Sequence, residues 1–212
     1  MNAHQITVKR IEKTLDIASF DDNAWDTAEP VIIDKYWSGE PAPEGRHTQV
    51  RLLWSDGDLY VRFDATQTEP LVISDRPDIS QKTMGLWERD VCEIFIAPDP
   101  STPNKYFEFE IAPTGEWLDL AMELDGDRRI TDAEYRSNIR HAARIETDMV
   151  TMALAIPFAS LGGPPSLGDA WLGNLFRCVG SGESRGYLAW QPTFTEKPNF
   201  HVPSCFAPIL FV

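Results

Sequence analysis

Short runs of alternating apolar and polar residues, separated by turn-forming residues, recur along the chain and constrain its fold more than any other feature. The runs TQVRLLW and DLYVRFDA flank Ser55-Asp56-Gly57, and an Asp-Gly pair between two such runs favours a β-hairpin. Further runs start near residues 91, 105, 117, 149, 170, 187 and 206, whereas helical periodicity is almost absent. The pattern predicts an all-β fold, an antiparallel β-sandwich of about 9–11 strands.

The size and charge of the chain limit its organisation and its partners. Its 212 residues contain no linker, repeat or low-complexity tract, so we expect a single domain over residues 1–212. The net charge of −14 would repel nucleic acid and anionic membrane surfaces, and no apolar run is long enough to cross a membrane. We therefore expect neither a nucleic-acid nor a membrane partner. The sequence leaves the oligomeric state open.

A carboxylate in the middle of an apolar strand marks the candidate site. Glu93 interrupts the run VCEIFIA, and the run KYFEFEI that follows it carries Glu108 and Glu110 on one face. If these two runs pair as a hairpin, Glu93 shares that face, and Asp119 on the next run is expected to extend the row. The pattern predicts a sheet face that mixes carboxylates with aromatic and arginine side chains, which suits a binding site better than a plain solvated surface.

The order of these motifs resembles a known family. The segments LWERDVCEIFIAPDP, KYFEFEIAPTGEWLDL and YLAWQPTFTEKPNFHVP are similar to the family 9 carbohydrate-binding modules (CBM9). They are closer to the bacterial family 9-like proteins of the DOMON-like group of β-sandwiches, whose sheets have jelly-roll or immunoglobulin-like packing. The resemblance implies a non-catalytic protein that binds a monosaccharide or oligosaccharide, with the end of a sugar chain as one form of ligand. It also implies a periplasmic or secreted location, although the chain as given shows no signal peptide and would otherwise be expected in the cytoplasm.

In the family, two tryptophans sandwich a terminal sugar, while a carboxylate, an arginine and an asparagine bind its hydroxyls. Trp87 and Glu93 match the first tryptophan and the carboxylate by their spacing, and Asn199 matches the asparagine. No tryptophan follows Asn199, so Phe200 or Trp190 is expected to replace the second ring. Strand alternation offers the arginine. The candidate ligand-binding residues are Trp87, Glu93, Arg62, Arg177, Asn199, Phe200 and Trp190.

Structural and functional alternatives stay open at this stage. Trp87 could cap the core, and Glu93 could be a buried acid paired with Arg51, Arg62 or Arg177. A glycan-processing hydrolase could use Glu93, Glu108, Glu110 and Asp119, since paired carboxylates perform that chemistry. The missing tryptophan would also fit an interaction domain that has lost sugar binding. A DOMON-type haem domain would need axial ligands, for which Met84 or Met122 with His201 are available.

A calcium ion is a candidate cofactor, because family 9 modules hold structural calcium, although the resemblance assigns no ligands here. The acidic loops offer carboxylate oxygens, the ligands that calcium prefers, but none matches an EF-hand. These loop pairs are Asp21 and Asp22, Asp56 and Asp58, Asp75 and Asp78, and Asp125 and Asp127.

Overall fold

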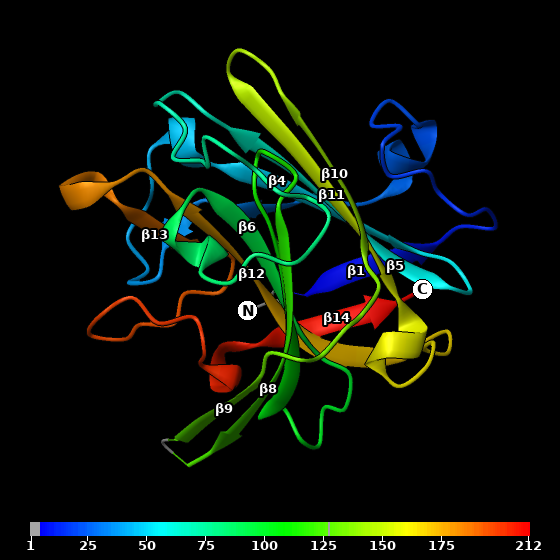
Figure 1. Ribbon diagram of the computed structural model, residues 1–212. Coiled ribbons are helices and arrows are strands. Elements are labelled where there is room, and N and C mark those ends of the chain that lie inside the picture. The colour runs from blue at the N-terminus through cyan, green and yellow to red at the C-terminus, as the bar shows by residue number, and fades with distance from the viewer. Residues whose placement is uncertain (1–4, 127) are drawn as a thin grey trace.

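The computed structural model describes residues 5–126 and 128–212, and over these residues it consists of β-strands joined by loops and short 3₁₀ helices (Figure 1). The strands are β1 (Ile6–Arg10), β2 (Val31–Ile33), β3 (Lys35–Tyr36), β4 (Thr48–Trp54), β5 (Asp58–Thr66), β6 (Val91–Ala97), β7 (Lys105–Ile111), β8 (Trp117–Asp125), β9 (Arg128–Asp132), β10 (Arg140–Ile145), β11 (Met149–Pro157), β12 (Ala170–Val179), β13 (Gly186–Ala189) and β14 (Ala207–Phe211). The 3₁₀ helices are η1 (Asn23–Thr27), η2 (Glu44–Arg46), η3 (Leu86–Glu88), η4 (Phe158–Leu161), η5 (Gly182–Ser184) and η6 (Pro203–Cys205).

The strands form two layers that are joined through β1. One layer has the order β10-β11-β5-β4, with β2 beside β4, and the other has the order β14-β12-β6-β7-β8-β9, with β13 and β3 beside β12. The first half of β1 pairs with β14, and its last two residues pair with β4. Because one strand belongs to both sheets, the two layers are a single hydrogen-bonded sheet that folds over itself.

The structure confirms the predicted all-β sandwich and differs from the prediction in its details. Residues 5–126 and 128–212 contain 14 strands rather than 9–11, because strands as short as β2 and β3, with three and two residues, carry too little alternation to be recognised. Both pairings of β1 are parallel, so the sheet is mixed rather than purely antiparallel. No hairpin connects β1 to either partner, and its direction is therefore free of the constraint that hairpins impose.

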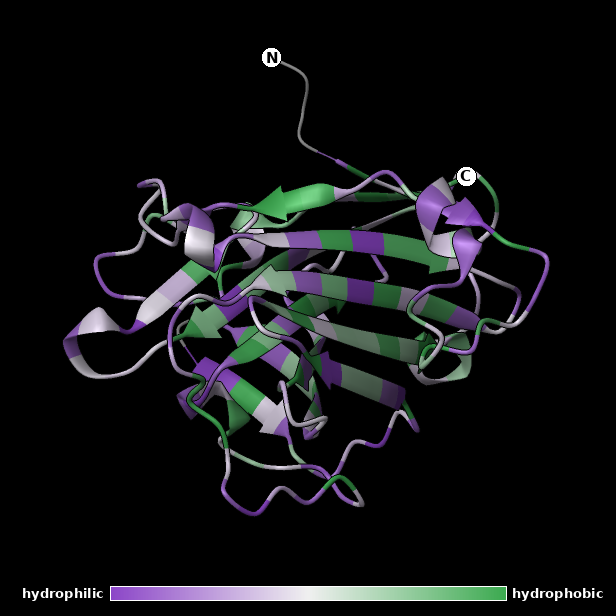
Figure 2. Ribbon diagram, turned by 90° about the horizontal axis from the view of Figure 1, so that it is seen from above, coloured by the Kyte–Doolittle hydropathy of each residue, from purple (hydrophilic) through white to green (hydrophobic). Residues whose placement is uncertain are grey.

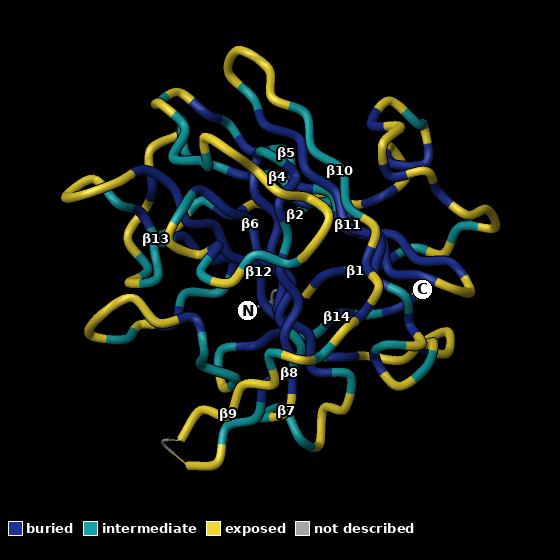
Figure 3. The backbone as a smooth tube through the Cα atoms, viewed as in Figure 1, coloured by how far each residue is buried: buried dark blue, intermediate teal, exposed yellow. Residues whose placement is uncertain are grey.

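The main core lies between the two layers. Alternate residues of each strand face inward, as with Ile94 and Phe109 from one sheet and Phe63 and Leu154 from the other. Figure 2 shows the resulting alternation of apolar and polar positions along the strands, and Figure 3 shows that the buried backbone follows the strands while the loops are exposed.

The outer face of each sheet is also covered in part. The segment that contains Leu15 and Trp25 packs on the β4-β5-β11 sheet, and residues including Phe200 and Phe206 pack on the sheet that contains β6. As a result, all seven residues of β6 are buried, including Glu93 at 2% exposure. This double burial explains why the strand around Glu93 is apolar at nearly every position.

The described ranges contain no helix that is both long and apolar enough to cross a membrane.

Candidate functional site

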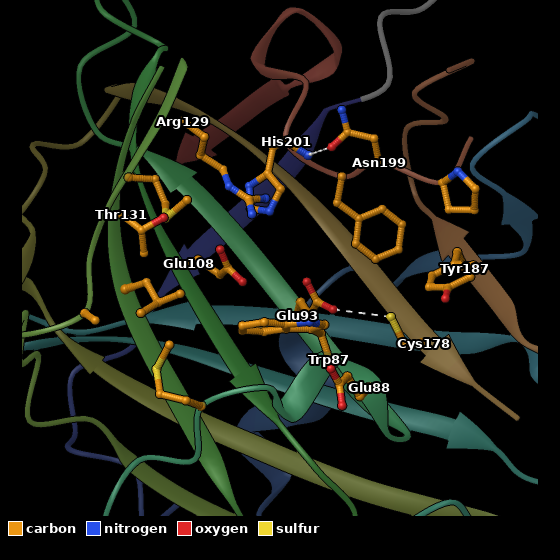
Figure 4. Close-up of a pocket in the computed structure, with 16 residues that line it drawn as sticks. Trp87, Glu88, Glu93, Glu108, Arg129, Thr131, Cys178, Tyr187, Asn199 and His201 are labelled. Atoms are coloured by element: carbon orange, nitrogen blue, oxygen red, sulfur yellow. Dashed lines mark hydrogen bonds between the residues drawn. The ribbon is translucent and has the colours of Figure 1, made fainter. Parts of the chain in front are cut away.

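A pocket of about 580 Å³ opens on the outer face of the sheet that contains β6, β7 and β12 (Figure 4). Its floor comes from the strands, and its walls come from the η3 loop, the β8-β9 hairpin, β13 and the loop after β13. The lining residues are Met84, Trp87, Glu88, Glu93, Glu108, Leu120, Met122, Arg129, Thr131, Ala133, Cys178, Tyr187, Pro198, Asn199, Phe200 and His201. Its volume lies within the range of small-molecule sites, roughly 300–1,000 Å³.

The strand register places three carboxylates on the pocket face. Glu93 lies directly opposite Glu110 on the neighbouring strand, and Glu108 lies on the same face of β7, two residues from Glu110. This part of the predicted row is confirmed. Asp119 lies opposite Phe109, whose side chain is in the core between the sheets, so the expectation that Asp119 extends the row is wrong.

Asp119 instead forms a buried structural contact. Its Oδ1 accepts a hydrogen bond from Lys82 Nζ at 2.8 Å, and its Oδ2 accepts bonds from the backbone and hydroxyl of Ser137 at 2.6 and 2.7 Å. The same Nζ also donates to the Tyr135 carbonyl oxygen at 2.6 Å. Lys82 therefore ties the long segment between β5 and β6 to the body of the protein, just before the residues that form one pocket wall.

The short helix η3 presents Trp87 at the rim of the pocket. Gly85 begins the turn with a left-handed backbone (φ 78°), which favours glycine, and Leu86 is fully buried beneath it. Trp87 is 41% exposed, so it does not cap the core. Arg185 Nη2 donates to the Trp87 carbonyl oxygen at 2.7 Å and to that of Arg89 at 2.7 Å, which fixes the backbone that carries the ring.

The opposite wall is the loop between Pro198 and Pro203, where the four consecutive residues 198–201 line the pocket. Asn199 Oδ1 accepts a hydrogen bond from the His201 backbone at 3.0 Å, which leaves its amide Nδ2 as the available donor. His201 Nδ1 shares a hydrogen bond with the Tyr106 hydroxyl at 2.8 Å. Phe200 stacks on Phe176 with ring centroids 4.1 Å apart and planes at 11°, so one face of its ring is already covered.

The arginine at the pocket is Arg129, a residue that the sequence reasoning missed. It lies on β9, opposite Leu124 of β8, and Thr131 lies opposite Met122, so both point to the pocket face. Figure 4 shows Arg129 beside His201 on the wall formed by this hairpin. The signal that could have found it is the Asp125-Gly126 pair, a hairpin sequence followed by a run in which Arg129 and Thr131 alternate with Ile130.

The structure corrects three residues expected at the site. Arg62 lies on the other sheet, where it forms a salt bridge with Asp64 at 2.8 Å. Arg177 lies on β12 but points between the layers, where it donates to Gln67 Oε1 at 2.6 Å and to several backbone carbonyls. Trp190 packs in the core between the sheets and is 8% exposed. Side chains alternate along a strand, and the immediate neighbours of Arg177 on β12 face the pocket. Arg177 therefore points to the opposite face of the sheet.

The alternative in which Glu93 is a core acid paired with an arginine is also wrong, because the contacts that the structure describes include no such pair. Arg51 pairs with Asp64 rather than with Glu93, at 3.0 Å. The hydrogen-bond partner of Glu93 is the Cys178 thiol, whose Sγ lies 3.5 Å from Glu93 Oε1. Glu93 therefore sits at the pocket floor without a cationic side chain bonded to it.

Burial and mutual proximity control the charge of these groups. Burial, followed by the nearby Glu108, holds the pKa of Glu93 well above its usual range. Burial also raises the pKa of Glu110 strongly, and the charges of the nearby Glu93 and Glu108 add to this effect. Burial lowers the pKa of His201 to about 3, and Arg129 contributes to this effect, so the imidazole is neutral near pH 7. The pocket floor thus holds carboxyl groups that resist carrying their full negative charge.

The chain has candidate ligands for two kinds of cofactor, a calcium ion and a haem. Among the described residues, one group of three metal-ligand side chains comes together, Glu93, Glu108 and Glu110, and it lies on the strands rather than in the loops. Asp127 lies outside the described residues. Met84, Met122 and His201 do line the same pocket, but a haem there would cover Glu93 and Glu108 with an apolar face and desolvate them at a high cost.

Comparison with known proteins decides the family. The sequence profile described as carbohydrate family 9 binding domain-like matches residues 17–206. The chain belongs to this family. The resemblance to family 9 that we predicted from the sequence is therefore confirmed over most of the length of this family 9-like domain. No curated protein matches the sequence.

Three solved structures share the fold of this family 9-like domain. A Bacteroides uniformis protein, for which carbohydrate binding is suggested, matches with a TM-score of 0.77 and 17% identity over 100% of both chains. A family 9 module from Caldicellulosiruptor kristjanssonii in complex with cellotriose matches with a TM-score of 0.69 and 17% identity, over 98% of this chain and 93% of that one. The same module in complex with glucose matches with a TM-score of 0.69 and 17% identity, over 99% and 96%.

Proposed function

We propose that the pocket binds a saccharide without catalysing its conversion. The observation that carries the proposal is the meeting of an exposed tryptophan, Trp87, with a buried acid, Glu93, and the amide of Asn199 around one cavity. Family membership supports the same conclusion, and so do the glucose and cellotriose complexes of a module with this fold.

Trp87 is suited to stack on the ligand. One face of a pyranose ring is made largely of C–H groups, and covering it with an indole ring removes apolar surface from water at roughly 25 cal/mol per Å². The η3 turn and the two bonds from Arg185 hold the Trp87 backbone in place, so little freedom is lost when the ligand binds. Phe200 and Tyr187 form the apolar side of the facing wall.

The polar groups of the pocket suit hydroxyls, which both donate and accept hydrogen bonds. Glu93 has one oxygen bonded to Cys178 and a second that can accept from the ligand. Asn199 Nδ2 and Arg129 are donors, because the acceptor of Asn199 is used within its loop and a guanidinium has none. His201 presents Nε2, since its Nδ1 is bonded to the Tyr106 hydroxyl.

The carboxylates do not form the row of four that the hydrolase alternative requires. Asp119 lies on the opposite face of the sheet and is held by Lys82, so it is outside the pocket. Glu93 and Glu108 are the strand glutamates that line the cavity, and they share it with a stacking ring in the arrangement of a binding site.

The test is calorimetric titration of the protein with glucose and with cellotriose, comparing wild type with Asn199→Asp. The aspartate keeps the acceptor for the His201 backbone and removes the amide donor, so we expect saccharide affinity to fall by about tenfold, about 1.4 kcal/mol. Glu196→Gln, an exposed change in the same loop, is the matched control and should bind as wild type does. Absence of saturable heat with either sugar in the wild type, with a normal thermal unfolding transition, would contradict the proposal.

A further inference from the structure

The strands beneath the pocket bring three carboxylates into a compact, buried group. Glu93 from β6 and Glu108 and Glu110 from β7 are 2%, 3% and 0% exposed, and one oxygen from each lies within 4.8 Å of the other two. The sheet register creates this group, because the residues share one face of two adjacent strands. Like charges placed this close on neighbouring strands destabilise a sheet unless something compensates them.

A second observation shows that the compensation does not come from hydrogen bonds. Neither carboxylate oxygen of Glu110 has a hydrogen-bond partner, although its side chain is fully buried, and Glu108 Oε2 has none either. Buried polar atoms in proteins are nearly always paired, and each one left unpaired costs roughly 1–3 kcal/mol. Glu110 therefore directs two unpaired oxygens into a group that already holds two other acids.

Among the described residues, no cationic side chain forms a hydrogen bond or an ion pair with the three glutamates. Arg129 lines the same pocket, but the structure gives it no bond to any of them. Lys82 is on the opposite face of the sheet with Asp119, and Arg177 points between the layers. Arg185 lies 3.6 Å from Asp90 and donates to backbone carbonyls. None of these side chains reaches the three glutamates within hydrogen-bond distance. A cation from outside the protein would neutralise the charge of the glutamates.

We propose that Glu93, Glu108 and Glu110 bind a divalent hard cation of the calcium class at the floor of the pocket. Three oxygens within 4.8 Å of one another can surround one ion at no more than about 2.8 Å, so small side-chain shifts bring them to the 2.3–2.6 Å that calcium prefers. Each carboxylate offers one oxygen to this group, which contains no nitrogen or sulfur ligand, and such a set selects hard cations over zinc or copper. Calcium suits the group better than magnesium, which keeps several waters in a strict octahedron.

The pocket supplies the entry path for the ion. Glu93 and Glu108 line the cavity, whereas Glu110 lies behind them, so the ion would be held from below and reached from the pocket. Coordination positions on the pocket side remain for water. The ion site is inferred from the geometry of the carboxylates and does not depend on saccharide binding. Ion binding is also measurable with no saccharide present. Its failure would therefore leave the proposed sugar binding untouched, and the reverse also holds.

The experiment is calorimetric titration of chelator-treated, dialysed protein with calcium chloride, without sugar, for wild type, Glu110→Gln and Glu123→Gln. Glu123 is the matched control, because it is a partly exposed strand glutamate of the same sheet that pairs with Lys105. We expect one calcium ion per chain in wild type and Glu123→Gln, and at least a tenfold weaker affinity in Glu110→Gln.

Thermal unfolding provides a second readout that does not depend on binding heat. Calcium should raise the unfolding temperature of wild type and of Glu123→Gln and leave that of Glu110→Gln unchanged. A cooperative unfolding transition of Glu110→Gln in chelator shows that the variant is folded. The proposal would be overturned if the folded wild type bound no calcium up to millimolar concentration. It would also be overturned if Glu110→Gln bound calcium as tightly as wild type, a result that would place the ion in the acidic loops.

Discussion

Glu93 and Glu110 lie directly opposite each other on β6 and β7, each almost fully buried, and neither is bonded to a basic side chain in the contacts that the structure describes. This pair explains why an acid interrupts the apolar strand β6. The outer face of that strand is covered by loops, yet it forms the floor of a pocket rather than a second solid core.

Replacing Glu110 by glutamine should stabilise the folded protein when calcium is removed by a chelator. The amide cannot carry the buried negative charge and can donate to a neighbouring glutamate, so we expect a gain of about 1–3 kcal/mol in the free energy of unfolding at pH 8. Because the folded-state pKa of Glu110 is raised, its contribution to stability is present at low pH and is lost as the pH rises through that pKa. Urea unfolding at pH 5 and pH 8 measures this; a destabilised variant at pH 8 would contradict it.

His201 should make the protein lose stability as the pH falls. Its pKa is lowered from 6.5 to about 3 in the fold by burial and then by Arg129, so the unfolded chain takes up a proton that the folded one does not. The stabilising contribution is therefore present above pH 6.5 and is lost as the pH falls toward 3, at up to about 1.4 kcal/mol per pH unit. His201→Gln should flatten the stability profile between pH 6.5 and 5. An unchanged slope would show that other groups cause the loss.

Lys82→Met should destabilise the protein strongly. Lys82 and Asp119 form a buried ion pair, with side-chain exposures of 8% and 0%, and removing one partner leaves a buried charge. The expected loss is about 3–5 kcal/mol in the free energy of unfolding. Lys105→Met is the control, since its ion pair with Glu123 is exposed and is worth less than about 1 kcal/mol. Equal losses in the two variants would refute the structural role of Lys82.

Arg129→Met should weaken saccharide binding, and Arg128→Met should not. The two arginines are adjacent on β9, so strand alternation sends Arg129 to the pocket face and Arg128 to the opposite face. Loss of a charged donor to a sugar hydroxyl should reduce affinity by about tenfold, about 1.4 kcal/mol. Titration with cellotriose at equal protein stability compares the two; a similar effect of both changes would mean that long-range charge, not contact, is responsible.

The sequence was sufficient to predict the fold, the floor of the pocket and residues of two of its walls, Trp87 on one and Asn199 with Phe200 on the other. Alternation is a local property, so it placed Glu93, Glu108 and Glu110 on one face correctly. It failed for Asp119, because the register across the turn between β7 and β8 decides which residues of β8 share that face, and these are Leu118 and Leu120.

The arginines show the limit of sequence reasoning more clearly. Arg177 was expected at the site, but its partners Thr66 and Gln67 are more than 100 residues away and belong to the other layer, which no local pattern reveals. Arg129 was missed because β9 is a short strand with every residue exposed, and such a strand has no apolar stripe to mark its face.

The measurement that tests the central claim most directly is titration of wild type, Trp87→Ala and Trp117→Phe with cellotriose by calorimetry. Trp117 lies outside the pocket, where its ring packs on His141, and serves as the control for loss of a tryptophan. We expect saturable binding by wild type and Trp117→Phe and at least a tenfold loss in Trp87→Ala. Equal affinity of Trp87→Ala and wild type, with both folded, would contradict a saccharide site built around this ring.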